Sequence, residues 1–200
     1  MVAITPDFLI IGGGVIGLNL ALQARSHNPD ARITLIEKED VCGKHASGRN
    51  SGVLHAGFYY TADSLKARLT REGNRRLTEY CLERGLEINR CGKLVVAKNA
   101  SELPVIDELL ARAKANEVEL FEVSAAEAKQ IEPRVRMYGR ALFSPTTASV
   151  DPKAVVGSFV SDALDAGIQL LTGTRYLGVK DGVVSTTRGK IAAGYVINAA

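Results

Sequence analysis

A glycine-rich turn between an apolar run and a helical pattern is the feature that most restricts how this chain can fold. Residues Phe8–Ile11 form a short continuous apolar run, which is typical of a central strand in a parallel sheet. Gly12, Gly14 and Gly17 follow with the spacing GxGxxG. The first glycine allows a tight turn, the second lets a pyrophosphate approach the backbone, and the third lets the helix pack on the strand. The pattern predicts a strand, a turn and a helix whose positive N-terminal end faces phosphates.

A second predicted strand ends in an acid where a dinucleotide-binding fold requires one. Residues Arg32–Glu37 read RITLIE, and Glu37 comes twenty residues after Gly17. A carboxylate at this place accepts hydrogen bonds from a ribose diol, and it would repel the 2′-phosphate of NADP. The alternative is a glycine turn in an unrelated α/β protein with a surface glutamate. The fingerprint by itself does not separate NAD from FAD.

The stretch after Glu37 lacks the next βαβ repeat of an NAD-binding domain. It reads KEDVCGKHASGRNSG and has no apolar period until Val53. A long ordered loop in a compact domain is usually functional. Its hydrogen-bond donors and small residues suit the pyrophosphate and ribityl chain of an extended cofactor, which favours FAD. The residues concerned are Ser47, Arg49, Asn50, Ser51 and Gly52.

Composition excludes several other classes of protein. The chain has 200 residues, of which 46% are hydrophobic and 24% charged, as in a globular domain with at most a small extra lobe. A net charge of +3 gives no reason to expect nucleic acid as a partner. Cys42, Cys81 and Cys91 form no CxxC pair, so we expect no metal site, no disulfide framework and a reducing, cytoplasmic location. The apolar run Phe8–Ala24 is too short for a membrane span, which leaves at most peripheral association with the inner face of a membrane.

Several short motifs, taken together and in order, resemble the D-amino-acid-oxidase-like FAD-dependent oxidoreductases. After GGGVIG and the acid at Glu37 come RNSGVLHAGFYY, SLKARL, EYC, RGL and CGKLVVA. Each motif alone is unspecific, but their combination is most similar to the L-2-hydroxyglutarate dehydrogenase/oxidase group. The resemblance runs to INAA at the end of the chain. Glycerol-3-phosphate dehydrogenases share a related histidine–glycine segment, so they and the amino-acid or amine oxidases of the superfamily remain alternatives.

The resemblance implies FAD as the cofactor and a small 2-hydroxy acid as the substrate. L-2-Hydroxyglutarate would be oxidised to 2-oxoglutarate by hydride transfer to flavin N5, and the electrons would pass to oxygen or a quinone. His55 is expected near the reactive face of the flavin as the catalytic general base; alternatively, it only hydrogen-bonds the cofactor or the backbone. The expected cofactor-binding residues are Gly12, Gly14, Val15, Ile16, Gly17, Glu37, Lys38, Ser47, Arg49, Asn50, Ser51, Gly52, Tyr176 and Ala199.

Three further residues are weaker candidates for contact with the substrate. They are Tyr59, Lys66 and Lys93. Lys66 lies on the basic face of a predicted helix close to the histidine segment, and Lys93 begins a predicted strand. A solvated surface position is the alternative for both lysines.

The order of the predicted elements indicates an α/β fold with two domains. The resemblance implies a Rossmann-like FAD-binding domain with a parallel sheet from residues 1–85 and 150–200, and part of an α+β substrate-binding domain with a mixed or antiparallel sheet from residues 86–149. Family members continue well beyond the point that corresponds to Ala200. We therefore expect a fragment, a truncated product, or half of a split protein with a complementing C-terminal chain. A non-catalytic FAD-binding fragment is the second functional hypothesis.

Local signals predict three further features. Asp63 is expected to cap a helix over residues 64–84 that stops at Gly85. Ser124 and Glu127 have the spacing of a capping box. The dipeptide Asp181-Gly182 predicts a hairpin turn.

Overall fold

The computed structural model describes residues 5–200, and the chain divides into two compact units. Unit 1 contains the chain up to residue 51 and residues 152–200, and unit 2 contains residues 52–151. The predicted FAD-binding domain included residues 52–85, whereas these residues pack within unit 2. Residues 1–4 of that predicted domain lie outside the described part of the chain.

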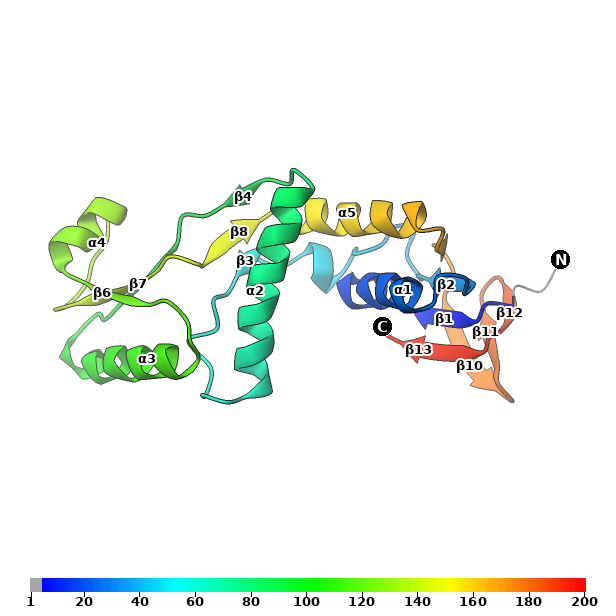
Figure 1. Ribbon diagram of the computed structural model, residues 1–200, viewed down its shortest axis with the longest axis horizontal. Helices are drawn as coiled ribbons and strands as arrows, with labels where there is room; N and C mark the ends of the chain where they lie inside the picture. Colours follow the sequence, from blue (N-terminus) through cyan, green and yellow to red (C-terminus); the bar gives the residue numbers. More distant parts are fainter. Residues whose placement is uncertain (1–4) are drawn as a thin grey trace. The chain divides into compact units, whose positions relative to one another are not determined.

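A four-stranded parallel sheet forms the middle of unit 1 (Figure 1). Its strand order is β13 (Tyr195–Asn198), β1 (Phe8–Ile11), β2 (Ile33–Ile36) and β9 (Gln169–Leu171). The predicted strands at residues 8–11 and 32–37 are thus neighbours in one sheet.

Strand β1 is buried on both faces, because successive residues of a strand point to opposite sides. Ile10 faces α1 (Val15–His27), where a Cβ on Gly17 would lie 3.4 Å from its side chain. Leu9 and Ile11 belong instead to a buried cluster with Val184. This double burial explains the continuous apolar run in the sequence.

Two kinds of element complete unit 1. Helix α1 packs beside α5 (Pro152–Asp165), and an antiparallel sheet covers the Leu9 side of β1. The covering sheet consists of β10 (Tyr176–Lys180), β11 (Val183–Thr186) and β12 (Gly189–Ala192). Asp181 and Gly182 join β10 to β11 with φ values of 50° and 76°, so the predicted hairpin turn is confirmed.

Unit 2 contains two antiparallel sheets of three strands each and three α-helices. One sheet has the order β3 (Val53–Leu54), β8 (Ala148–Val150), β4 (Ile88–Asn89), and the other β5 (Lys93–Val96), β7 (Ala141–Ser144), β6 (Phe121–Val123). The helices are α2 (Leu65–Glu83), α3 (Leu103–Ala115) and α4 (Ala125–Ile131). Short 3₁₀ turns lie at η1 (Ala46–Gly48) in unit 1 and η2 (Ala100–Glu102) in unit 2.

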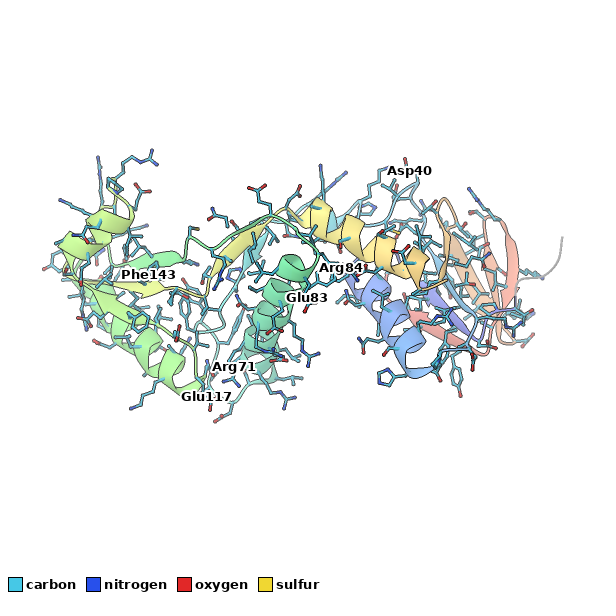
Figure 2. The ribbon with its side chains drawn as sticks, turned by 45° about the horizontal axis from the view of Figure 1, so that its top comes forward. Asp40, Arg71, Glu83, Arg84, Glu117 and Phe143 are labelled. Atoms are coloured by element: carbon cyan, nitrogen blue, oxygen red, sulfur yellow. The ribbon has the colours of Figure 1, made fainter. Side chains whose placement is uncertain are left out.

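The core of unit 2 fixes α2 and α3 against the strands. Phe58, Ile106 and Leu142 are buried in one cluster that α3 shares with β7. Arg71 of α2 donates to the backbone carbonyl of Asn116 at 2.8 Å and to the Glu117 carboxylate, and Figure 2 shows Arg71 and Glu117 side by side. These contacts attach α2 to the C-terminal end of α3.

The helix signals in the sequence were partly right. Ser64, not Asp63, caps α2, because the Ser64 Oγ accepts a hydrogen bond from the Ala67 N–H at 3.1 Å. Asp63 precedes the cap with a left-handed φ of 59°, so the predicted cap was one residue too early. The capping box of α4 is confirmed, since Ser124 and Glu127 bond each other's backbone N–H groups.

Candidate functional site

The carboxyl ends of β1, β2 and β13 border a cavity of about 400 Å³ in unit 1. Ligands of open α/β sheets bind at this edge, where the strand order changes direction. Eight of the residues predicted to bind a cofactor line the cavity: Gly12, Gly14, Ile16, Glu37, Lys38, Ser47, Tyr176 and Ala199.

The glycine turn leaves no room for larger residues at two of its positions. Gly12 has a φ of 110°, and a Cβ there would lie 2.7 Å from the carbonyl oxygen of Ala199. A Cβ on Gly17 would lie 1.9 Å from the carbonyl oxygen of Gly12. The turn is therefore closed by backbone contacts on both sides, as the GxGxxG spacing predicts.

Helix α1 begins at this turn without an N-cap side chain of its own. Gly14 is the N-cap residue, and the Ser47 Oγ accepts a hydrogen bond from the Val15 N–H at 3.0 Å. The first N–H groups of a helix have no partner within the helix, so those of Ile16 and Gly17 are donors for an anion. Ser47 thus brings the loop after β2 to the positive end of α1.

Glu37 connects the end of β2 to the turn after β1. One carboxylate oxygen accepts from the Gly13 N–H at 2.6 Å, and the other accepts from the Glu39 N–H at 2.9 Å. The side chain is almost buried and still lines the cavity. Each carboxylate oxygen can accept a second hydrogen bond, so Glu37 can also bind a ribose diol.

The other predicted cofactor residues have different surroundings. The amide of Asn50 donates to the carbonyls of Ala46 and Ser47 at 3.0 Å each, which holds the loop. Arg49 lines a second cavity of unit 1 instead of this one. Ser51 is the last residue of that segment of unit 1, and Gly52 begins unit 2 with a φ of 68°.

The cavity is also lined by residues that the sequence analysis did not name individually. They include His45, Ala46, Thr174, Arg175 and Asn198. The backbone N–H of Thr174 donates to the carbonyl of Glu37 at 2.8 Å, which places the chain before Tyr176 beside the end of β2. Thr174 and Arg175 belong to the segment TRYLGV, which the family resemblance places at the adenine, whereas only proximity in sequence to Ser47 and Ala199 could have indicated the others.

His55 lies in unit 2, directly after β3, on a segment whose backbone is held by three side chains. Asn74 of α2 donates to the carbonyl of Leu54 at 2.9 Å. Arg112 and Asn116, at the end of α3, donate to the carbonyls of Tyr59 and Tyr60 at 2.8 and 2.9 Å. A loop fixed in this way can present a side chain precisely enough for chemistry.

The groups around His55 favour its neutral form. Partial burial of the imidazole, and then the positive charge of Lys93, lower the pKa of His55 below its ordinary value. The Lys93 ammonium lies 4.7 Å from the centre of the Tyr59 ring, whereas Lys66 lies 4.5 Å from that of Tyr60. Of the predicted substrate residues, Lys93 thus contacts Tyr59 and acts on His55, whereas Lys66 pairs with a different ring. A neutral imidazole can accept a proton, and a lysine beside it suits an anionic ligand.

Within residues 5–200, no three His, Cys, Asp or Glu side chains are grouped so that they could hold a metal ion. The helices of this described range include none with the length and apolar character needed to cross a bilayer.

The chain belongs to the FAD dependent oxidoreductase family (DAO), which it matches over residues 7–200. It is 37% identical over 185 residues to the L-2-hydroxyglutarate dehydrogenase of Escherichia coli K12, covering 91% of this chain and 44% of that protein. It is 36% identical over 183 residues to the mitochondrial L-2-hydroxyglutarate dehydrogenase of Homo sapiens, covering 91% and 39%. The chain therefore spans less than half the length of these curated relatives.

Solved structures show the same fold. L-α-glycerophosphate oxidase from Mycoplasma pneumoniae, with FAD bound, matches with a TM-score of 0.88 at 26% identity, over 98% of this chain and 54% of that one. L-proline dehydrogenase from P. horikoshii matches with a TM-score of 0.87 at 23% identity, over 99% and 53%. The predicted family and the predicted α/β fold, with a parallel Rossmann-like sheet and antiparallel sheets, are confirmed.

Proposed function

We propose that the cavity at the carboxyl ends of β1, β2 and β13 binds the ADP half of FAD. One observation carries this proposal: a glycine turn, the N-terminus of α1 and the nearly buried Glu37 carboxylate meet in one cavity. The turn has the form that lets phosphate oxygens approach the backbone, and Glu37 has the chemistry that a ribose diol requires. The residues present therefore fit the group that the family implies.

Each residue of the cavity has a separate proposed role. The N–H groups at the start of α1, with the Ser47 hydroxyl, would bind the pyrophosphate. Glu37 would accept from the ribose diol, with Lys38 next to it. The backbone near Tyr176 would contact the adenine, and Ala199 would border the cofactor from the end of β13.

We further propose that the protein oxidises a small 2-hydroxy acid, with L-2-hydroxyglutarate as the substrate and 2-oxoglutarate as the product. When bound, FAD supplies the acceptor for the hydride that leaves the substrate carbon. A neutral ring nitrogen of His55 would take the proton of the substrate hydroxyl, since its lowered pKa keeps it unprotonated near neutral pH. Lys93 and Tyr59 would hold a substrate carboxylate beside it.

The remaining parts of the proposal rest on the family resemblance. They are oxygen or a quinone as the final electron acceptor, a location in the cytoplasm or at the inner face of a membrane, and a complementing C-terminal chain.

The experiment is to purify the chain, add FAD and record the visible absorption spectrum. We expect a bound-flavin spectrum that bleaches without oxygen when L-2-hydroxyglutarate is added, and the D-enantiomer is the matched control. A His55→Gln variant should keep the flavin and bleach at least about 100-fold more slowly, within the range of general-base catalysis.

Each outcome decides a different part of the proposal. Bound flavin that never bleaches would support the cavity assignment and favour the second candidate, an FAD-binding fragment. In that case a complementing C-terminal chain should restore bleaching. A chain that takes up no FAD would overturn the cavity assignment.

A further inference from the structure

A second cavity of about 700 Å³ lies in unit 1, between the loop after β2 and helix α5. It shares no lining residue with the cavity proposed for the cofactor. Its volume falls within the range of about 300–1,000 Å³ that small-molecule sites occupy. The function proposed above makes no use of it.

The lining of this second cavity is mainly apolar. Val160 and Leu170 contribute from α5 and β9, and Val41 and Leu164 lie at 54% and 56% exposure. Val156 supports the loop, because a Cβ on Gly43 would lie 2.6 Å from its side chain. Large apolar side chains gathered around a hollow usually mark a binding site.

The charged side chains of the lining are mostly cationic. Lys44, Arg49 and Lys153 are present with one acid, Asp40. Asp40, labelled in Figure 2, pairs with Lys44 at 2.7 Å. Arg49 also lines the cavity and adds a positive charge beyond that pair. The lining therefore complements a ligand with an apolar body and a negative group.

We propose that this second cavity binds an amphipathic carboxylate, such as a medium-chain alkyl carboxylate. The alkyl body lies along Val160 and Leu170, and the carboxylate lies toward Arg49. Burial of the alkyl chain supplies affinity and the cations supply selectivity.

The loop of this cavity also contacts the glycine turn. The Gly43 N–H donates to the Gly13 carbonyl at 2.9 Å, and Gly13 in turn donates to Glu37 at 2.6 Å. A ligand that rests on Gly43 is therefore expected to change the surroundings of Gly13. Any effect of this ligand on cofactor affinity rests on the FAD proposal. Binding of the carboxylate to the second cavity does not rest on it.

The test is calorimetric titration of the full chain with decanoate, without added FAD. Decanol is the matched neutral ligand, and we expect it to bind at least about tenfold more weakly, as loss of a charge-assisted contact implies. Gly157→Leu should abolish binding, because Gly157 lines the cavity and a Cβ there meets no atom within 4 Å. Arg49→Gln should weaken decanoate binding several-fold.

The matched control is Gly73→Leu. Gly73 also lies inside a helix, α2 of unit 2, with no atom within 4 Å of a Cβ, and it lines neither cavity of unit 1. Both substitutions replace a glycine within a helix by a residue of higher helix propensity, so neither should unfold the protein. Amide NMR shifts on adding decanoate should include Gly43, Val160 and Gly13.

Several results would overturn the proposal. Equal binding by Gly157→Leu and wild type would reject the location, and equal affinity for decanol would reject the anion. Heat measured only at decanoate concentrations at which decanoate self-associates would mean that decanoate is an adventitious additive only. Decanoate binding by a chain that takes up no FAD would support this proposal and reject the FAD proposal, so the two failures are distinguishable.

Discussion

Gly17 lies at a position where any side chain would collide with the backbone. A Cβ there would be 1.9 Å from the Gly12 carbonyl oxygen, and the obstacle is main chain that cannot rotate away. The glycine is thus required by the close packing of α1 on β1, before any ligand is considered.

We predict that Gly17→Ala lowers the free energy of unfolding by about 3 kcal/mol, at the upper end for overpacked sites. Urea unfolding followed by circular dichroism measures it. Gly157→Ala is the control: a Cβ there meets no atom within 4 Å, so the change should stabilise α5 by about 1 kcal/mol. Equal midpoints for the two variants would contradict the packing argument.

The titration of His55 tests how its surroundings act on it. Partial burial and then Lys93 lower its pKa, so Lys93→Met should raise the pKa toward its ordinary value without restoring it fully. Lys66→Met is the control and should leave the titration unchanged, because Lys66 lies over Tyr60. NMR of the ring protons from pH 4 to 9 measures both. An unchanged pKa in Lys93→Met would remove Lys93 from the environment of His55.

The same shift has a consequence for stability. A folded pKa below the ordinary value of 6.5 means that the unfolded chain binds the proton more tightly. The contribution of neutral His55 to the free energy of unfolding is therefore present above pH 6.5. It is lost as the pH falls from 6.5 through the pKa of His55 in the folded state. Lys93→Met should reduce this loss.

At the scale of elements, Asn74 joins α2 to two separate parts of unit 2. Its amide nitrogen donates to the Leu54 carbonyl at 2.9 Å and to the Thr146 carbonyl at 3.0 Å. Leu54 ends β3 and directly precedes His55. One side chain therefore fixes the start of the His55 segment and the turn between β7 and β8.

We predict that Asn74→Asp lowers the free energy of unfolding by about 2 kcal/mol, because a carboxylate has the same shape but cannot donate to two carbonyls. The His55 ring signals should shift as well. Asn99→Asp is the control, since Asn99 acts through its Oδ1 as an acceptor for Ser101 at 3.0 Å, and an aspartate keeps that cap. Urea unfolding measures the free energy of unfolding of both variants. An equal decrease in Asn74→Asp and Asn99→Asp would contradict the role of the Asn74 amide as a hydrogen-bond donor.

At the scale of the whole molecule, ion pairs make stability depend on pH in acid. The Arg32 guanidinium beside Asp7 lowers the pKa of that carboxyl from 3.8 to about 2. Arg75 and Arg76 lower the pKa of Glu72 from 4.5 to about 2. These carboxylates bind protons more weakly in the folded state. Their contribution is thus present above their ordinary pKa values and is lost as pH falls toward 2.

We predict a urea midpoint that decreases between pH 5 and pH 2, and a smaller decrease in the variant Asp7→Asn. The Asp7 and Arg32 side chains are both exposed, so 1 M salt should reduce the difference in urea midpoint between Asp7→Asn and wild type. A salt-independent difference would mean that the Asp7–Arg32 pair acts by something other than charge. Lys114→Gln, a surface change for which the structure gives no ion pair, is the control.

Local chemistry made much of this protein predictable. The glycine turn, the acid at Glu37, the capping box at Ser124 and the Asp181-Gly182 hairpin depend on neighbours a few residues away. Their sequence patterns therefore carry the information. The Asp63 cap failed by one residue for the same reason, since Ser64 beside it is an equally good cap.

The sequence by itself thus determined the family, the parallel sheet and the glycine turn with its acid, because periodicity and spacing encode them directly. Only the tertiary structure decided that His45 and Ala46 line the cavity proposed for the cofactor, that Arg49 lines the second cavity, and that Lys93 rather than Lys66 acts on His55. It also placed residues 52–85 in unit 2. These results depend on strand order and on packing between distant segments. Several side chains are equally suitable by local sequence, and a local pattern does not predict which of them tertiary packing brings to a site.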